Sequence, residues 1–234
     1  MNSESTRNAI KSPIFAYAAP FGVFLLFLFL AQMLEKVVPT TDNVWLARPA
    51  YLIYPLQTIV CGALLLYVWR KIEFRGIAYL SVIFAVGFFV FAMWTSPQYF
   101  GWAAPRREGF NPDVFPAGSA SYWFTVIMRF VRLVIIVPLV EELFWRGFLL
   151  RYLINEDFTK VPFGTFRWFA FLATAVGFML EHQPSDYAAA LLCGLIYNAV
   201  ACTTKSLGSC VFVHAVTNLF LGFYIMFTKQ WGFW

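Results

Sequence analysis

The stretch SYWFTVIMRFVRLVIIVPLVEELFWRGFLLRYL, residues 121–153, decides the fold. It is apolar over far more than the roughly 20 residues that cross a bilayer as one helix. As a single helix it would measure about 50 Å, whereas the hydrocarbon core is roughly 30 Å thick. Pro138 is a favourable first residue for a new helix. We therefore expect a bend or break near Pro138, with Arg129 and Arg132 near a membrane interface.

The composition of the whole chain agrees with a membrane protein. Of its 234 residues, 61% are hydrophobic and 12% are charged, whereas soluble domains carry about 25% charged residues. Lipid must therefore cover much of the surface. The net charge of +5 does not indicate nucleic acid, because no basic run is dense enough to follow phosphates. The four cysteines lie in apolar stretches without a CxxC pair, which favours small buried side chains over a disulfide or zinc framework.

Further apolar spans predict an all-α, polytopic transmembrane helix bundle that forms a single integral membrane domain, residues 1–234. These spans are expected at 14–33, 51–69, 76–94, 166–182, 187–203 and 207–227. The total is about seven, or eight if residues 121–153 split. The first span is long for a signal peptide and is expected to remain uncleaved. The segment 95–119 is expected to form a loop that could cover one face, because its prolines exclude a spanning helix.

The distribution of basic residues predicts the orientation in the cell (inner or plasma) membrane. With seven spans and an inner N-terminus, inner segments hold nine lysines and arginines and outer segments hold five. The inner set is Arg7, Lys11, Arg70, Lys71, Arg75, Arg151, Lys160, Arg167 and Lys205, and the outer set is Lys36, Arg48, Arg106, Arg107 and Lys229. Basic residues favour the cytoplasmic side, so we expect a cytoplasmic N-terminus.

Ionisable side chains within apolar spans are costly and indicate function. The second half of the chain concentrates them in three groups: Glu141, Glu142 and Arg146; Glu181 and His182; His214 and Asn218. Glu142 and Arg146 are four positions apart and share a helix face, as do His214 and Asn218. Glu141 is rotated by about 100° from Glu142, so one carboxylate can be structural while the other lines a polar intramembrane cavity.

Each group also has a simpler interpretation. Glu142 and Arg146 alone would be a buried ion pair that holds helices together. His214 and Asn218 alone would be hydrogen-bonding residues between helices. Glu181 and His182 would be the solvated end of a span. Only the combination favours a functional site, and we expect Glu141, His182, His214 and Asn218 to converge on one cavity. That cavity should open toward the face where the span carrying His182 ends.

The order of three motifs resembles the CAAX protease and bacteriocin-processing (CPBP) family. The matching residues are Glu141-Glu142-x-x-x-Arg146, Phe178-x-x-x-His182 and His214-x-x-x-Asn218, and the resemblance covers a catalytic core at residues 121–227. The length and aromatic richness are similar to those of an exosortase-associated subgroup. The resemblance implies a glutamic intramembrane endopeptidase that acts near the C-terminal tail or anchor of a membrane-associated protein or peptide, either prenylated or bearing a sorting anchor.

The resemblance also implies the role of each matched residue. Glu141 and His182 would activate water, and His214 and Asn218 would stabilise the oxyanion. Glu142, Arg146 and Phe178 would support the site. No metal and no cofactor would be needed. Glu181, an acid directly before His182, departs from the apolar or small residue that is expected there, and it would alter His182 or contact the substrate.

Two other classes of function remain open from the residues alone. The first is a zinc-dependent membrane hydrolase with the two histidines and glutamates as ligands, although no HExxH motif is present. Activity that survives strong chelators would exclude it. The second is a non-catalytic membrane protein, either an immunity factor, a scaffold or a proton-coupled carrier. A carrier would more often show paired halves with matching broken helices, and none is evident.

Overall fold

The structure, a computed structural model, describes residues 12–38 and 41–234, and all regular secondary structure in this part of the chain is helical. Arg7 and Lys11 of the predicted inner segment lie outside these residues. Six helices are long and apolar enough to cross a membrane, and a shorter apolar helix makes seven. The main helices are α2 (Pro13–Glu35), α4 (Ala50–Val68), α5 (Leu80–Tyr99), α6 (Ala120–Val131), α7 (Val137–Glu142), α8 (Leu150–Tyr152), α9 (Trp168–Glu181), α10 (Tyr187–Thr204) and α11 (Leu207–Thr228). The predicted all-α membrane bundle is confirmed.

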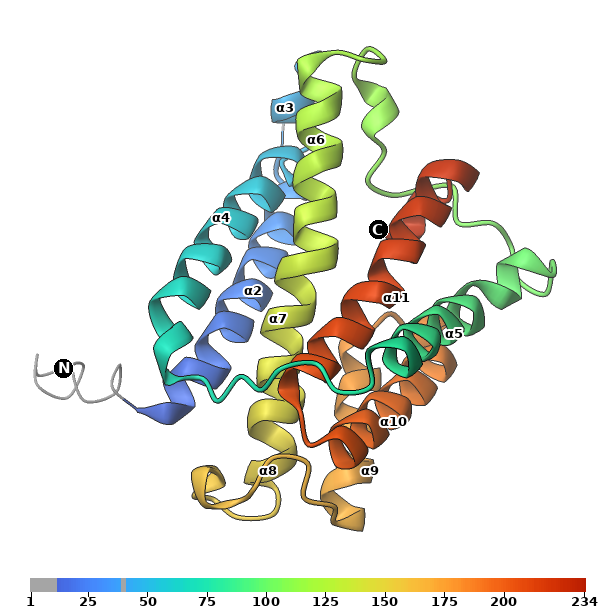
Figure 1. Cartoon of the computed structure of the whole chain (residues 1–234). Helices are drawn as coiled ribbons and strands as arrows, with labels where there is room; N and C mark the ends of the chain where they lie inside the picture. Colours follow the sequence, from blue (N-terminus) through green and yellow to red (C-terminus); the bar gives the residue numbers. More distant parts are fainter. Residues whose placement is uncertain (1–11, 39–40) are drawn as a thin grey trace, which may run out of the picture.

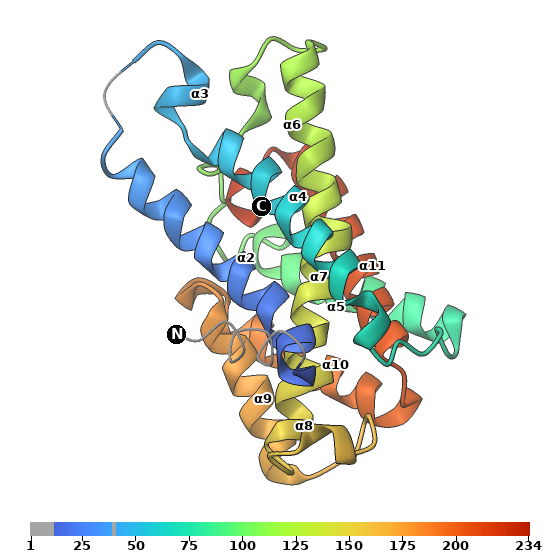
Figure 2. The same ribbon diagram turned by 90° about the vertical axis from the view of Figure 1, so that its left-hand side faces the viewer.

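The helices pack around the long rod formed by α6, α7 and α8 (Figure 1). Helices α2 and α4 pair on one side of this rod, and the short helix α3 (Val44–Ala47) lies in the connection between them. On the other side, α11 packs along α5, and α10 packs along α9. Figure 2 shows the rod from the side on which α2 and α4 lie. The rod therefore contacts both halves of the bundle.

Polar caps define where several of these helices begin. The Ser119 hydroxyl accepts a hydrogen bond from the Tyr122 N–H and starts α6, and the Ser206 hydroxyl accepts one from the Ser209 N–H and starts α11. These oxygens satisfy N–H groups that have no partner inside the helix. Ser12 caps α2 in the same way, followed by Pro13 at the first helical position.

Of the bend or break expected near Pro138, the break is absent, because the chain is helical without interruption from Ala120 to Tyr152. Two π-helical segments, Arg132–Ile136 and Leu143–Leu149, flank α7 instead. In the first, the Val137 N–H donates to the Arg132 carbonyl. The next bond of this pattern would run from residue 138 to Leu133, but proline has no N–H. The Asn218 side chain of α11 donates to the Leu133 carbonyl at 2.9 Å, and the neighbouring helix thus supplies the missing donor.

The short helix α9 explains how His182 reaches the depth of Glu141 without a break in the rod. A connection joins the end of α8 to the start of α9 at one end of the bundle (Figure 1). Glu141 lies about 17 Å from Tyr152 by helical rise, and His182 lies about 21 Å from Trp168. With only 14 residues, α9 is much shorter than the rod. His182 therefore lies near the level of Glu141 although the rod continues well beyond it.

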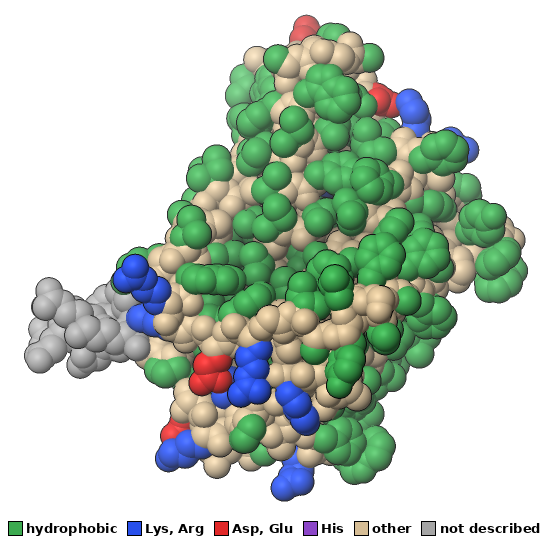
Figure 3. Space-filling view, in the orientation of Figure 1, with side chains coloured by type: hydrophobic (Ala, Val, Ile, Leu, Met, Phe, Trp, Pro, Cys, Tyr) green, Lys and Arg blue, Asp and Glu red, His purple; other side chains and the backbone are tan. Residues whose placement is uncertain are grey.

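The interhelical loops form two opposite faces. On one face, the Ser206 hydroxyl contacts the Arg75 carbonyl, the Lys205 ammonium donates to the Gly164 carbonyl, and Arg151 pairs with Glu73. Lysine and arginine side chains gather toward this end of the molecule, the lower end in Figure 3, whereas hydrophobic side chains cover most of the surface above.

The opposite face consists of the loop after α5 and the C-terminal segment. Here Arg106 forms an ion pair with Asp186, the Gly232 N–H donates to the Arg106 carbonyl at 3.0 Å, and Lys229 pairs with Asp113 at 2.6 Å. The Tyr51 hydroxyl donates to the Asn111 carbonyl at 2.6 Å. The loop is thus fastened to α4, to the start of α10 and to the end of α11.

Candidate active site

A cavity of about 380 Å³ lies between the rod and the helices α2, α9, α10 and α11. Its lining includes Glu141, His182, His214 and Asn218. The structure thus brings together the four residues that were singled out from three separate motifs. Gln183 and Asp186, which follow α9, and residues of the C-terminal segment line the cavity as well. The cavity therefore reaches the face where α9 ends, as predicted.

Glu141 points its carboxylate into the cavity without a partner from the described residues. Its side chain is only 6% exposed, it lines the cavity, and no described residue donates a hydrogen bond to it. A buried carboxylate needs hydrogen bonds to offset the loss of solvent. Water or substrate in the cavity is the available source of those bonds.

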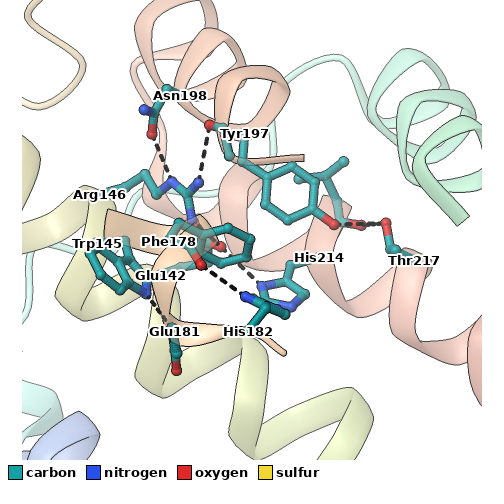
Figure 4. Close-up of polar contacts among 12 residues, drawn as sticks. Glu142, Trp145, Arg146, Phe178, Glu181, His182, Tyr197, Asn198, His214 and Thr217 are labelled. Atoms are coloured by element: carbon teal, nitrogen blue, oxygen red, sulfur yellow. Dashed lines mark hydrogen bonds and ion pairs between the residues drawn. The ribbon is translucent and has the colours of Figure 1, made fainter. Parts of the chain in front are cut away.

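Glu142 lies in a buried charged cluster with Arg146 and His214 (Figure 4). One of its oxygens accepts from Arg146 Nη1 and contacts His214 Nδ1, both at 3.0 Å. Glu142 and Arg146 are fully buried. The predicted pairing across one helical turn is present, and His214 joins it. The two adjacent glutamates therefore have different surroundings, as their rotation about the helix axis predicts.

Arg146 connects the rod to the neighbouring helices. Its Nε donates to the Asn198 side chain at 3.0 Å, and its Nη2 donates to the Gly194 carbonyl at 3.2 Å. The guanidinium also lies 4.8 Å from the centre of the Phe178 ring. A cation in this position is stabilised by the ring face. Arg146 thus fixes α9 and α10 relative to Glu142.

The hydrogen bonds of the two histidines define which ring nitrogen carries a proton and which one is left to act on a substrate or on water. His182 Nδ1 lies 2.8 Å from the Phe178 carbonyl, and a carbonyl only accepts, so Nδ1 carries the proton. In the neutral ring, Nε2 is then the basic nitrogen. His214 uses Nδ1 toward the Glu142 carboxylate. Its Nε2 can donate a hydrogen bond only when the ring is the doubly protonated imidazolium.

Phe178 is the common neighbour of both histidines. Its ring centre lies 4.8 Å from the His182 ring and 6.4 Å from the His214 ring. The buried Tyr197 ring lies 5.2 Å from the His214 ring, and the Tyr197 hydroxyl donates to Thr217 at 2.8 Å. These contacts hold the imidazoles between helices α9, α10 and α11. Tyr197 and Thr217 line the cavity but carry no sequence motif that would have identified them.

Glu181, which departs from the family pattern, also lines the cavity. Its carboxylate accepts a hydrogen bond from Trp145 Nε1 at 2.9 Å. A side chain at Gly177 would collide with the Trp145 ring, whose nearest atom lies 2.8 Å from an added Cβ. Gly177 therefore allows Trp145 to reach Glu181. The cavity contains a second carboxylate that is held by the protein, in contrast to Glu141.

Arg129 and Arg132, which were expected near a membrane interface, are enclosed by the protein. Both are buried, with 4% and 6% exposure, and both line the cavity. The cost of burying them is reduced by aromatic rings, because Arg132 lies 4.5 Å from the Tyr54 ring centre and Arg129 lies 4.8 Å from it.

No group of three or more His, Cys, Asp or Glu side chains among the described residues is arranged to hold a metal ion. Each histidine uses its Nδ1 for a contact within the protein, His182 toward the Phe178 carbonyl and His214 toward the Glu142 carboxylate. The cysteines Cys61, Cys193 and Cys210 are buried, and Cys202 is half-buried.

Fold and site together define a multi-pass helical membrane protein with a cavity, partly lined by polar side chains, between its helices. The family model described as "Rce1-like: Type II CAAX prenyl endopeptidase Rce1-like" matches residues 122–220. The match covers the part of the chain that carries the three motifs, in agreement with the resemblance to the CPBP family. The match supports a CAAX-type intramembrane protease in general terms. No curated protein and no solved structure shows a significant match.

Proposed function

We propose that the protein is a glutamic intramembrane endopeptidase that hydrolyses a peptide bond near the C-terminal tail or anchor of a membrane-associated protein. One observation carries the proposal: Glu141, His182, His214 and Asn218 line a single cavity, and Glu141 has no hydrogen-bond donor among the described residues. A carboxylate that is free to bind water, beside an imidazole with a basic Nε2, is a suitable arrangement for general base catalysis.

The reaction begins when Glu141, with His182, removes a proton from a water molecule. The water oxygen bonds to the carbon of the scissile carbonyl, and the carbonyl oxygen takes the negative charge. Collapse of this intermediate breaks the C–N bond. The proton first taken from water then passes to the leaving amine, so that the carboxylate and the imidazole return to their initial states.

His214 and Asn218 supply the donors for the oxyanion. His214 must act as the imidazolium, with Nδ1–H toward Glu142 and Nε2–H toward the substrate oxygen. One N–H of Asn218 is already given to Leu133, and the second N–H of the amide remains for the oxyanion. A donor of this kind contributes about 3 kcal/mol to transition-state stabilisation. Glu142, Arg146 and Phe178 act by positioning these groups.

The catalytic core comprises residues 121–227, but the cavity needs the N-terminal half as well. Phe24, Leu25 and Leu28 of α2 form part of its wall, and Leu25 is 38% exposed on the surface that faces lipid. An apolar anchor of the substrate, either a lipid group or a hydrophobic segment, would lie against this wall. Water would enter from the face that carries Gln183 and Asp186.

The orientation in the cell membrane follows from the basic residues. The face with Arg75, Arg151 and Lys205 holds more of them than the opposite face, so it is the cytoplasmic side and the N-terminus is cytoplasmic. The cavity then opens on the non-cytoplasmic face. A substrate would present its C-terminal tail on that side of the membrane.

Comparison of membrane proteomes from cells with the wild-type protein and with Glu141→Gln tests the function and identifies the substrate. We expect one or a few membrane proteins to accumulate with an uncleaved C-terminus in the variant. Glu156→Gln, an exposed glutamate between α8 and α9, is the matched control and should leave the termini as in the wild type. Identical C-termini in all three samples would contradict the proposal.

A further inference from the structure

Glu181 places a carboxylate in the cavity whose charge no cation of the described residues neutralises. The side chain is half-buried and lines the cavity. Its Oε2 accepts a hydrogen bond from Trp145 Nε1 at 2.9 Å (Figure 4), and it forms no ion pair among the described residues. An indole N–H donates a hydrogen bond but carries no charge. Arg146, the cation of the neighbouring cluster, already donates from all three of its side-chain nitrogens to other groups.

The second carboxylate oxygen of Glu181 is accessible to a bound molecule. Oε1 has no hydrogen-bond partner in the described part of the chain, and it is not one of the buried side-chain atoms that lack a partner. Glu142 shows the opposite case, because its Oε2 is buried and without a partner. Glu181 can thus accept a hydrogen bond from a ligand through Oε1 while Trp145 keeps hold of Oε2.

The arginines that line the cavity are engaged with other groups. Arg106 forms an ion pair with Asp186, and the guanidinium groups of Arg129 and Arg132 lie over aromatic rings. No lysine of the described residues lines the cavity. The described chain thus provides no cation for Glu181, and a bound molecule can supply one. Such a charge pair is stronger away from bulk water than in it.

Trp145 places Glu181 on the side of the cavity that α2 forms. The Trp145 ring centre lies 5.7 Å from that of Phe21 of α2, and Gly177 leaves room for the ring against α9. Trp145 thus lies between the two helices and holds the carboxylate there. Phe24, about one turn further along α2, belongs to the wall against which the apolar anchor of a substrate would lie. Glu181 therefore lies on the anchor side of the cavity.

We propose that Glu181 selects a substrate with a lysine or arginine on the anchor side of the scissile bond. This inference rests on the proposed protease function. Glu181 and His182 are consecutive, with Cα atoms about 3.8 Å apart, and His182 would act at the scissile bond itself. Since an extended chain advances about 3.3 Å per residue, a cation that reaches Glu181 would belong to one of the first two or so residues beside that bond. The apolar stem of the side chain would lie along the α2 wall, as such stems do on apolar surfaces.

Acyl-anchored peptides with randomised residues between the anchor and the free tail test the selection. The full-length wild type, in vesicles of zwitterionic lipid, should prefer lysine or arginine over glutamine or methionine within about two positions of the cut. The ratio of rates should be about tenfold, because hydrogen bonds to charged groups are the strong ones. In Glu181→Gln this ratio should fall to within about twofold, and Glu181→Lys should favour aspartate or glutamate instead. Glu156→Gln, the exposed control, should keep the wild-type ratio.

The ratio of rates separates selection of the substrate from folding and from positioning of His182. Glutamine can still accept a hydrogen bond from Trp145 Nε1, so Glu181→Gln should melt close to the wild type in detergent. Glu181→Asp keeps the charge and should retain part of the preference. Equal cleavage of basic and neutral peptides by the wild type, or an unchanged preference in Glu181→Gln, would overturn the inference while leaving the protease function standing.

Two additional arms cover the remaining outcomes. If phosphatidylethanolamine inhibits the wild type but not Glu181→Gln, and the wild type shows no preference for basic peptides, Glu181 binds the ammonium group of a lipid and the inference is wrong. If no peptide is cleaved, binding to immobilised Glu141→Gln protein decides. Retention of basic over neutral peptides that disappears in Glu141→Gln/Glu181→Gln would support the selection although the proposed protease activity had failed. Equal retention of both kinds, or the same preference in the double variant, would overturn the inference as well.

Discussion

At the scale of single residues, neighbouring acids in one motif have opposite surroundings. Glu141 has no donor among the described residues, whereas Glu142 is shared between Arg146 and His214 at 3.0 Å each. Truncation of a buried ion-pair partner leaves an unpaired charge, which costs about 3–5 kcal/mol. Replacement of an unpartnered carboxylate by an amide of the same shape costs far less. The two residues are thus separable by experiment.

Arg146→Ala should mainly lower the yield of folded protein, whereas Glu141→Gln should abolish activity at near-normal yield. The expected loss of stability is about 3–5 kcal/mol for Arg146→Ala and about 1 kcal/mol or less for Glu141→Gln. Melting curves of the detergent-solubilised proteins measure the difference. Equal destabilisation by the two changes would argue against this division of roles.

Residue spacing predicted the four cavity residues but not the environment of the arginines. The three motifs contain polar side chains that need partners inside a membrane, and this requirement is visible in the sequence. For Arg129 and Arg132, the cost of burying a charge in the membrane instead predicts a position near an interface. Only the folded chain brings Tyr54 and Gln57 of α4 beside them, and these contacts are separated from the arginines by some 75 positions.

At the scale of helices, a proline and an asparagine from different helices form one unit. Pro138 cannot donate to the Leu133 carbonyl, and the Asn218 amide does so at 2.9 Å. A break near Pro138 was the reasonable expectation from the length of the segment, because the sequence does not reveal a donor from another helix. The same unit positions Asn218 beside the proposed oxyanion and keeps the π turn intact.

This unit predicts coupling between Pro138 and Asn218. Asn218→Ala should destabilise the protein by about 1–3 kcal/mol, because a buried carbonyl loses its partner. In a Pro138→Ala background, residue 138 gains an N–H that can bond to Leu133, so the same change should cost less. A double-mutant cycle of melting curves should give a coupling energy of at least about 0.5 kcal/mol. Strict additivity of the two changes would contradict the account.

At the scale of the whole molecule, the two loop faces differ in basic residues and in access to the cavity. Among the described residues, seven lysines and arginines lie on the face of the α4–α5, α8–α9 and α10–α11 connections. They are Arg70, Lys71, Arg75, Arg151, Lys160, Arg167 and Lys205. The opposite face carries five, which are Lys36, Arg48, Arg106, Arg107 and Lys229. The cavity reaches the less basic face. The sequence predicted the spans, but only the structure shows which face the cavity meets.

Cysteine labelling in intact cells tests the proposed orientation. A membrane-impermeant thiol reagent should reach Gln183→Cys from outside and should reach Glu156→Cys only after permeabilisation, because the two exposed positions lie on opposite faces. The wild-type chain, whose own cysteines are buried or half-buried, gives the background. Labelling of Glu156→Cys alone in intact cells would reverse the orientation and place the mouth of the cavity in the cytoplasm.

The most direct test of the central claim is cleavage by purified protein of the substrate that accumulates in Glu141→Gln cells. The wild type, reconstituted in vesicles and assayed with a strong chelator present, should release the C-terminal fragment. Glu141→Gln should be slower by a factor of about 10² or more, the usual contribution of a general base, and Glu156→Gln should match the wild type. Cleavage by Glu141→Gln at a rate near that of the wild type would contradict the assignment of Glu141 as the catalytic base, and cleavage that the chelator abolishes would contradict a metal-free mechanism.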